Sequence, residues 1–404
     1  MQRRSADERV AAIFGRRRSL FADDLESRRQ MIAAAVAGAR VCVIGAAGSI
    51  GAAFVRQILP FAPRALHLVD LSENNLAEVV RDLHASGANA PDELRTLAIG
   101  LGSREFERYL AASAPFDWVI NFSALKHVRS ERDPYTLMRL YQTNVEWVDA
   151  LLSSLASFSP STRFFSVSSD KAVEPASLMG ASKAWMELVL RRWSDAVPST
   201  TARFANVAFS DGSLLYSFEQ RLRKGQPLAA PSDTRRYFIS EREAGELCLL
   251  ACFASRNRDL LIPRLDEERE LLGFDELARR FLAFHGYRPF LAASEEAARQ
   301  ATAAPPSGCW PCYFSQSDTS GEKAVEAFRA AHERVDETRF AAIGVIPQAP
   351  LESVEVARIE GAMQRMRALR DAASWDKETI VAAFQEALPT FRHLERHKSL
   401  DDKM

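Results

Sequence analysis

Arg40-Val-Cys-Val-Ile44, followed at once by Gly45-Ala-Ala-Gly48-Ser-Ile-Gly51, is the stretch that decides the fold. The apolar run is typical of a buried strand, and the segment up to Leu59 is typical of a helix. Glycines at this spacing let the backbone turn tightly, let a pyrophosphate approach and let the helix pack on the sheet. A purely structural glycine turn is the alternative. Because a helix N-terminus attracts negative charge, we expect a dinucleotide site here, formed by Gly45, Gly48, Ser49, Ile50 and Gly51.

Asp70 ends the next expected strand, 65–69, and follows Gly51 by 19 residues. A carboxylate at this place should accept hydrogen bonds from the adenosine ribose and repel a 2′-phosphate. The expected cofactor is therefore NAD rather than NADP, with helix capping as the other possible role of Asp70.

Strand and helix patterns alternate from residue 40 to about 207. Further strands are expected at 94–99, 118–122 and 163–167, with helices between them. This alternation predicts an α/β, Rossmann-type, doubly wound parallel sheet. We expect a helical N-terminal extension over 1–38, the NAD-binding domain over 39–207, a smaller substrate lobe over 208–345 and a helical C-terminal extension over 346–404.

The bulk composition points to a globular, cytoplasmic protein. A formal net charge of -1 gives no electrostatic reason to expect nucleic acid as a partner. The apolar stretch 31–54 is interrupted by Arg40 and by glycines, so no membrane segment is expected. The N-terminal arm and an amphipathic tail helix around Ile359 and Met363 favour a homo-oligomer.

Five cysteines are too few and too unevenly placed for a disulfide framework in a chain of 404 residues. Cys309-Trp-Pro-Cys312 with Cys248 and Cys252 could form a zinc site, but neither pair has the usual setting for one. We expect buried structural cysteines and no metal.

The segment 166–183 carries the candidate chemistry. Ser169, Asp170 and Lys171 follow the strand expected at 163–167, and Lys183 lies on the next helix. Met179 and Lys183 have the spacing of the Tyr-x-x-x-Lys pair of short-chain dehydrogenases, with methionine in place of tyrosine. Because a thioether cannot remove a proton, the general base must be another group.

With these segments together, the chain resembles the UDP-N-acetylglucosamine 4,6-dehydratase and polysaccharide-biosynthesis branch of the extended short-chain dehydrogenase/reductase family. The resemblance covers most of residues 40–330. Besides the glycine turn, it rests on 69–75, Ser123-Ala-Leu-Lys-His-Val128, Thr143-Asn-Val145, 168–173, 179–183, Arg203-Phe-Ala-Asn-Val207, Arg236-Tyr-Phe238 and, weakly, Gly321-Glu-Lys323.

The resemblance implies NAD-dependent 4,6-dehydration of a UDP-N-acetylhexosamine, that is, a lyase. Lys171 would abstract the C5 proton, Asp170 would protonate the departing C6 oxygen, and Ser169 with Lys183 would relay the C4 proton. Ser123 and Ala124 are expected at the cofactor, as is Lys183. The substrate-binding candidates are Lys126, Asn206, Arg235 and Arg236.

Two other functions stay open. A 4-epimerase of the same sugar class normally keeps the tyrosine that Met179 replaces. The second alternative is a non-catalytic protein that binds NAD or a nucleotide sugar. In such a protein the tyrosine would have been lost by decay of the catalytic site.

Overall fold

The computed structural model describes residues 6–87, 90–127, 131–316 and 323–393, so Val128, Gly321 and Glu322 of the predicted motifs lie outside the described residues. Its centre is one large sheet with the strand order β14-β10-β6-β5-β4-β1-β2-β3. All neighbouring strands run parallel except β10 and β14. The strands are β1 Arg40–Ile44, β2 Ala65–Val69, β3 Glu93–Leu97, β4 Trp118–Asn121, β5 Arg163–Ser169, β6 Ser199–Phe204, β10 Asp259–Pro263 and β14 Ile343–Pro347.

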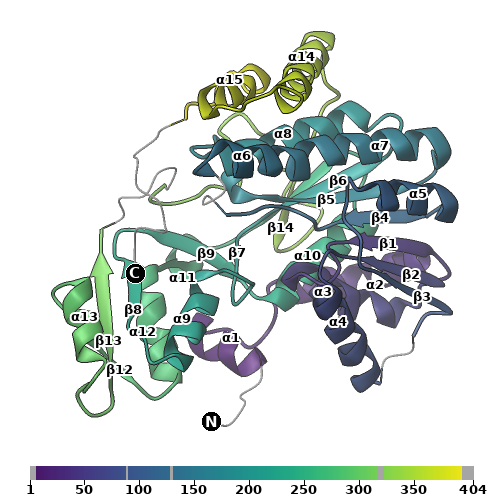
Figure 1. The fold of residues 1–404 in the computed structure, drawn as a ribbon. Coiled ribbons are helices and arrows are strands. Elements are labelled where there is room, and N and C mark those ends of the chain that lie inside the picture. Colours follow the sequence, from purple (N-terminus) through teal and green to yellow (C-terminus); the bar gives the residue numbers. More distant parts are fainter. Residues whose placement is uncertain (1–5, 88–89, 128–130, 317–322, 394–404) are drawn as a thin grey trace.

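The strand order reverses between β1 and β4, which is the point where doubly wound sheets bind ligands. Helices cover both faces of the sheet (Figure 1). One layer contains α2 Ala22–Val36, α3 Ser49–Ile58, α4 Glu73–Ala85 and α10 Glu241–Phe253. The other contains α5 Arg104–Ser113, α6 Pro134–Tyr141, α7 Trp147–Phe158 and α8 Leu178–Trp193. The predicted Rossmann-type fold is confirmed.

Strand β1 shows why the sheet is buried on both sides. Val41 and Val43 belong to the core beneath α3 and α10, whereas Cys42 and Ile44 belong to the core beneath α5 and α8. Successive side chains of a strand point to opposite faces, so a strand that is apolar at every position needs cover on both.

A smaller lobe follows β6 and has its own core. It holds two three-stranded sheets, β11-β9-β7 and β12-β13-β8, and lies at the left in Figure 1. Its strands are β7 Asn206–Val207, β8 Leu228–Pro231, β9 Arg235–Ile239, β11 Leu271–Gly273, β12 Arg288–Leu291 and β13 Cys309–Ser315. Its helices are α9 Leu214–Arg223, α11 Glu267–Glu270, α12 Phe274–Phe284 and α13 Glu295–Ala301.

The expected division into 39–207 and 208–345 stays a prediction, and the sheet topology bears on its second part. The second segment supplies β10, α10 and most of β14 to the large sheet and its helical cover, so the chain leaves the sheet and returns to it. Leu261 and Val345 pair across β10 and β14 and are fully buried. Strands β10 and β14, which are both apolar, form the end of the sheet that lies opposite β3.

Both terminal extensions pack on their own chain. Helix α1, Ala6–Phe14, joins the core of the lobe, and α2 joins the core of the large sheet. Helices α14, Ser353–Arg370, and α15, Lys377–Ala387, cover α6 and α8 (Figure 1). The apolar stripe with Ile359 and Met363 is therefore buried within the chain, and homo-oligomerisation stays a prediction that this stripe no longer supports.

Candidate active site

The glycine turn joins β1 to α3 at the switch point. Gly45 has a φ of +72°, and a Cβ there would lie 2.7 Å from the backbone nitrogen of Ser123. A Cβ on Gly51 would lie 2.1 Å from the carbonyl oxygen of Gly45, whereas one on Gly48 would meet its nearest atom at 3.6 Å. Two glycines thus serve the packing of the turn, whereas a Cβ on Gly48, at the N-cap of α3, would make only an ordinary van der Waals contact. The uncrowded backbone at Gly48 and the partly exposed N-terminus of α3 fit a pyrophosphate.

Asp70 lies directly after β2, where its carboxylate accepts hydrogen bonds from the backbone N–H groups of Ala47 (3.0 Å) and Ser72 (2.9 Å). It therefore ties the glycine turn to the start of α4. Its predicted contact with the ribose stays a prediction.

The loop after β4 is held in place by two buried asparagines. Asn121 accepts from the N–H of Ser123 (3.0 Å), while Asn144 accepts from the N–H of Leu125 (2.9 Å) and donates to its carbonyl (2.8 Å). Asn144 lies in a π-helical turn, Gln142–Glu146, a rare element that is frequent at functional sites. Ser123 and Ala124 are thereby positioned beside the glycine turn, and Lys126 is exposed on the same loop.

The candidate catalytic segment lies at the carboxyl end of β5, where a single 3₁₀ turn holds Asp170 and Lys171. Asp170 is 3% exposed, and its Oδ1 accepts from the Ser169 hydroxyl (2.8 Å) and from Nζ of Lys171 (3.1 Å). The Lys171 side chain keeps 24% exposure. The pair thus joins a buried carboxylate to a lysine that is only partly exposed, so it is not an ion pair of the open surface.

Helix α8 packs closely on this turn. The Ser177 side chain caps the helix by accepting from the N–H of Gly180 (3.1 Å). A Cβ on Gly180 would lie 2.2 Å from the carbonyl oxygen of Lys171, so only glycine allows this approach. One turn further, buried Lys183 donates to the carbonyl of Val167 (3.0 Å). The structure therefore brings Lys183 to β5, the strand that ends at Ser169 directly before Asp170.

Met179, at the position of the missing tyrosine, is 3% exposed and belongs to the core beneath α8. Its backbone N–H donates to Oε1 of Glu131 (2.8 Å). Glu131 was not predicted; it is a buried carboxylate that ties the start of α8 to the segment after β4.

The substrate-binding candidates of the lobe differ in accessibility. Asn206 donates to the carbonyl of Tyr237 over a long distance of 3.5 Å. Arg235 is exposed, with one contact to the carbonyl of Leu271 at 3.3 Å. Arg236 is 3% exposed and donates to the carbonyl of Ala324 (3.0 Å). Arg236 is therefore committed to internal contacts, and Arg235 is the better placed of the two for a diphosphate.

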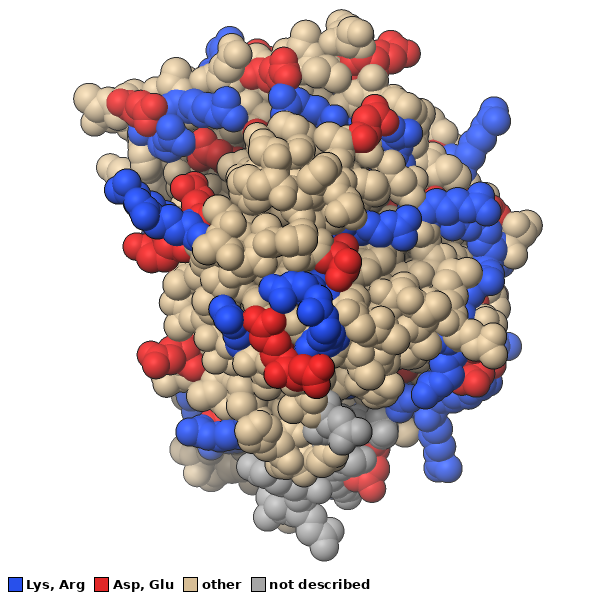
Figure 2. Space-filling model, turned by 90° about the vertical axis from the view of Figure 1, so that its right-hand side faces the viewer, with Lys and Arg blue, Asp and Glu red and all other residues tan. Residues whose placement is uncertain are grey.

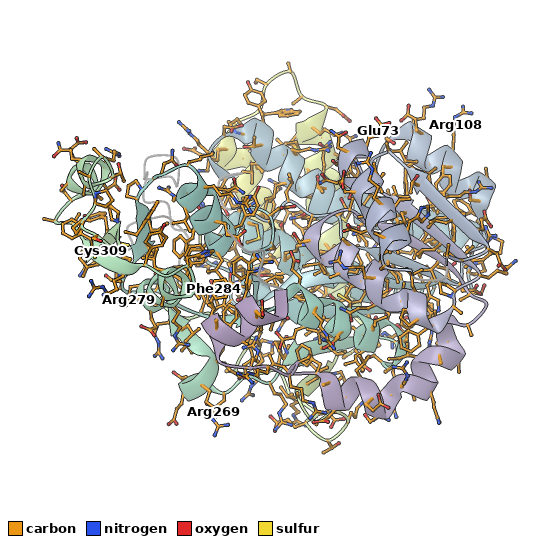
Figure 3. All side chains as sticks on the ribbon, turned by 90° about the horizontal axis from the view of Figure 1, so that it is seen from below. Glu73, Arg108, Arg269, Arg279, Phe284 and Cys309 are labelled. Atoms are coloured by element: carbon orange, nitrogen blue, oxygen red, sulfur yellow. The ribbon has the colours of Figure 1, made fainter. Side chains whose placement is uncertain are left out.

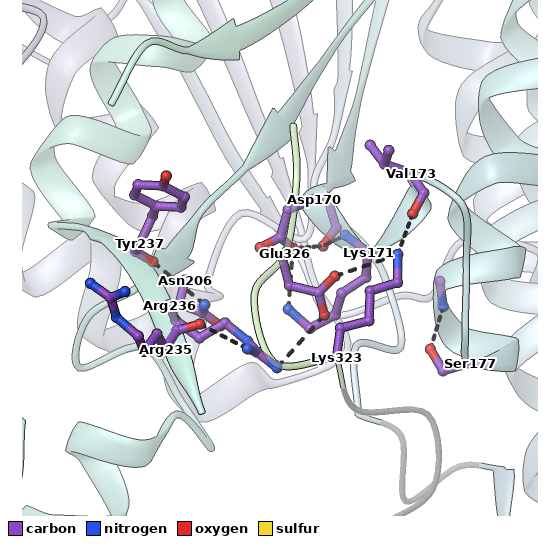
Figure 4. Close-up of polar contacts among 12 residues, drawn as sticks. Asp170, Lys171, Val173, Ser177, Asn206, Arg235, Arg236, Tyr237, Lys323 and Glu326 are labelled. Carbon is purple, nitrogen blue, oxygen red and sulfur yellow. Dashed lines mark hydrogen bonds and ion pairs between the residues drawn. The ribbon is translucent and has the colours of Figure 1, made fainter. Parts of the chain in front are cut away.

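Sequence reasoning also missed Glu326, a buried residue next to the candidate pair (Figure 4). Its carboxylate lies 3.8 Å from Arg236 and 3.9 Å from Lys323. Lys323 in turn donates to the carbonyl of Val173 (2.8 Å). Its position three residues after the weakly matched Gly321-Glu-Lys323 was the available signal.

A second buried network supports the other side of β5. Glu187, one helical turn after Lys183, accepts from the Ser168 hydroxyl (2.5 Å) and from Arg203 (2.7 Å). Arg203 also pairs with Glu333 (2.6 Å). The matched Arg203 motif is thus a structural tie between α8, β6 and the segment before β14.

The cysteines do not converge. All five are free thiols; Cys248 and Cys252 lie in buried helix α10, whereas Cys309 and Cys312 lie on β13 of the lobe. In Figure 3, Cys309 and Arg279 both lie in the lobe, at the opposite end of the view from Glu73 and Arg108. Among the described residues, no group of three or more His, Cys, Asp or Glu side chains could hold a metal ion.

The charge of the surface and the hydropathy of the helices were each compared with what a charged or membrane-bound partner would need. On the side that carries β3 and α5, acidic and basic side chains are interspersed (Figure 2). Within the described ranges, no helix is both long and apolar enough to cross a membrane.

A parallel sheet whose strand order reverses and a glycine turn at its switch point define a doubly wound, Rossmann-type fold. Comparison with known sequences then gives the family. The chain belongs to the polysaccharide biosynthesis protein family, whose profile matches residues 41–303.

Three relatives illustrate the membership. The chain is 28% identical to an uncharacterised membrane protein of Methanocaldococcus jannaschii, over 62% of this chain and 73% of that protein. It is 27% identical to the probable polysaccharide biosynthesis protein EpsC of Bacillus subtilis, over 68% of this chain and 46% of that protein. It is 25% identical to a UDP-N-acetylglucosamine 4,6-dehydratase (inverting) of Campylobacter jejuni, over 56% of this chain and 66% of the relative. The chain thus spans less than half the length of EpsC.

Solved structures show the same fold. Pen from Bacillus thuringiensis superposes with a TM-score of 0.62 at 18% identity, covering 81% of this chain and 98% of that one. DesIV, a dTDP-glucose 4,6-dehydratase of Streptomyces venezuelae solved with NAD, has a TM-score of 0.54 at 20% identity, over 84% of this chain and 99% of the other. The protein is related to nucleotide-sugar dehydratases and epimerases.

Proposed function

We propose that the protein is a 4,6-dehydratase of a UDP-N-acetylhexosamine, with UDP-N-acetylglucosamine as the first candidate substrate, NAD as cofactor and a role in surface-glycan biosynthesis. The observation that carries this proposal is the buried Asp170 at 3.1 Å from the partly exposed Lys171. An acid and a base side by side suit an elimination, in which one proton is taken from carbon and another is given to the departing oxygen.

The cofactor would be held by the backbone at Gly48 and the N-terminus of α3, beside the loop with Ser123 and Ala124. When bound, a nicotinamide would accept a hydride from C4 of the sugar and return it at C6. NAD rather than NADP is supported by the carboxylate of Asp70 after β2.

Each side chain then has a defined task. Lys171 takes the C5 proton that a 4-keto group has acidified, the C6–O bond breaks, and Asp170 gives its proton to the oxygen, which leaves as water. The Ser169 hydroxyl donates to Asp170 (2.8 Å), so it relays the proton of the C4 hydroxyl to the Asp170 carboxylate, and this is the proton that Asp170 later gives to the departing oxygen. Burial lowers the pKa of Lys183 to about 8, against the opposing effect of Glu187, so this lysine exchanges protons near neutral pH.

The substrate would lie between this segment and the lobe. Exposed Arg235 supplies a cation for the diphosphate, and Lys126 a second one at the cofactor side. Asn206, at the start of the lobe, would order the loop near the sugar.

The test incubates the purified protein with NAD and UDP-N-acetylglucosamine and follows the nucleotide sugar by mass spectrometry. Loss of one water supports the dehydratase, and in deuterium oxide the product should also gain deuterium at C5. An isomer of unchanged mass would instead identify a 4-epimerase. Absence of conversion across UDP- and GDP-sugars, with NAD still bound, would leave a binding protein.

Lys171→Met is the decisive variant, because it removes the base and keeps the length of the side chain. We expect it to bind NAD normally and to form no product. Lys224→Met, at an exposed position after α9, is the matched control and should behave as the wild type. Full turnover by Lys171→Met would refute the role assigned to Lys171.

A further inference from the structure

A cavity of about 510 Å³ lies where helices α1, α2, α3 and α10 meet the start of the lobe. Each of these five parts contributes an apolar side chain to its wall: Val10, Leu25, Ala53, Leu249 and Ala208. This volume is typical of a site for a small molecule. Among the described residues that line the cavity, none belongs to the glycine turn, the loop after β4 or the segment after β5. The cavity is therefore separate from the proposed active site.

Close packing of α3 on α10 forms one side of the cavity. A Cβ on Gly245 of α10 would lie 3.1 Å from the carbonyl oxygen of Ala53 on α3. The side chain of Gln57, also on α3, donates to the carbonyl of Arg242 (2.8 Å). A wall that is already held in this way loses little conformational entropy when a ligand binds.

The cavity carries an excess of positive charge, because four arginines and two glutamates line it. Arg242 is paired with Glu246 (3.0 Å). Exposed Arg56 meets its nearest acidic partner, Asp82, only at 4.0 Å, and exposed Arg29 has no acidic partner in the part of the chain that the structure describes. Guanidinium groups bind phosphate through paired hydrogen bonds. Arg29 and Arg56 therefore favour a phosphorylated ligand.

Phe209 gives the cavity an aromatic side. Its φ of +62° lies in the left-handed region, which a bulky side chain rarely adopts and which persists only where the surroundings hold it. The guanidinium of Arg9 lies over its ring, 4.6 Å from the centroid. Nη1 of Arg9 pairs with Glu219 (2.7 Å), whereas its buried Nε has no hydrogen-bond partner within the described ranges. Rings and guanidinium planes are the surfaces on which nucleobases stack.

We propose that this cavity is a second binding site, which takes a nucleoside phosphate. Arg29 and Arg56 bind the phosphate, and the base stacks beside Arg9 and Phe209. The carboxylate of Glu241, which also lines the cavity, accepts from an N–H group of the base. This site goes beyond the proposed dehydration and does not depend on it. A free phosphate would use the arginines alone, so the aromatic side distinguishes a nucleotide from a simple anion.

The first experiment measures affinity by calorimetric titration with AMP, GMP, CMP and UMP. At least one of them should bind with a Kd below about 1 mM and at least about tenfold more tightly than inorganic pyrophosphate, which cannot use the aromatic side. The double variant Arg29→Gln/Arg56→Gln should bind the same nucleotide at least about tenfold more weakly. It should keep the thermal midpoint of the wild type, because neither arginine has a close acidic partner among the described residues. Arg108→Gln, exposed on α5, is the matched control.

The second experiment places the nucleotide on the wild-type protein. The photoreactive analogues azido-AMP and thio-UMP should label peptides that contain Val10 or Phe209, as read by mass spectrometry. The same labels should form in Gly48→Ala, which alters the glycine turn. The inference would be overturned by labels confined to the glycine turn, by pyrophosphate binding as tightly as every mononucleotide, or by a folded double variant with unchanged affinity. Failure of all four mononucleotides to bind would overturn it as well.

Discussion

Nζ of Lys183 lies 3.0 Å from the carbonyl oxygen of Val167, and the lysine is 4% exposed. A neutral carbonyl compensates an ammonium only partly, and burial therefore lowers the pKa of Lys183 from 10.5 to about 8, although Glu187 acts in the opposite direction. The folded protein thus binds fewer protons than the unfolded chain between these two pH values. Its stability should rise with pH across this window, and the full cost of burying the ammonium is present below pH 8.

Lys183→Met should consequently be more stable than the wild type at pH 7, by on the order of 2 kcal/mol after the lost hydrogen bond is included. The advantage should shrink as the pH rises towards 10.5. Urea unfolding of both proteins at the two pH values measures it. Exposed Lys224→Met is the control, and an advantage that stayed constant with pH would contradict the titration of Lys183.

Gly180→Ala should damage the site through backbone contact. The added Cβ would lie 2.2 Å from the carbonyl oxygen of Lys171, so α8 or the Asp170–Lys171 turn must shift. We expect a loss of about 1–3 kcal/mol in stability and at least about tenfold in turnover. Gly361→Ala on α14 is the matched control, because its Cβ meets only a side-chain oxygen at 3.4 Å. Equal behaviour of the two variants would argue against the tight contact.

Gly48 and Gly51 should separate ligand binding from folding. Gly51→Ala places a methyl group 2.1 Å from a backbone oxygen and should lower the thermal midpoint, whereas Gly48→Ala meets nothing closer than 3.6 Å and should fold normally. Gly48→Ala should nevertheless bind NAD at least about tenfold more weakly, because the methyl group occupies space expected for the pyrophosphate. Calorimetric titration with NAD measures this. Unaltered binding by Gly48→Ala would place the cofactor elsewhere.

Arg235 and Arg236 should respond differently to the same substitution. Arg236→Gln removes a buried partner of Glu326 and should cost about 3 kcal/mol of stability. Arg235→Gln should leave the thermal midpoint unchanged and raise KM for the nucleotide sugar by about tenfold. Thermal unfolding and steady-state kinetics on both variants provide the comparison. A normal KM for Arg235→Gln would remove Arg235 from the substrate site.

Asn144→Ala should loosen the loop after β4. It removes two hydrogen bonds to Leu125 and one to Ser182 (2.8 Å), with an expected cost of about 2–3 kcal/mol. Hydrogen exchange at Leu125 should accelerate, and NAD should bind more weakly. Asn75→Ala, at an exposed position on α4, should change none of these. Unchanged exchange at Leu125 would show that other contacts hold the loop.

Local sequence was enough to predict the strand, glycine turn and helix over 40–59 and the placement of Asp170 and Lys171 after β5. These features follow from short-range rules: an apolar run must be buried, a position such as Gly45 with a φ of +72° favours glycine, and a strand ends where polar residues begin. The expected reaction came from the family resemblance. Met179 says something about the reaction only when it is compared with the tyrosine that short-chain dehydrogenases have at this position.

Contacts between distant segments were decided by the folded chain alone. From the sequence alone, β10 and β14 would be assigned to the lobe. In the folded chain they belong to the large sheet, where Leu261 pairs with Val345. Arg235 and Arg236 are neighbours of the same type, and only the packing of β9 buries one and exposes the other. Glu326 lies next to Asp170 and Lys171 in the folded chain, although more than a hundred residues separate it from them in the sequence. Periodicity records which side chains must be buried, but the partner that each buried charge meets depends on the three-dimensional path of the chain.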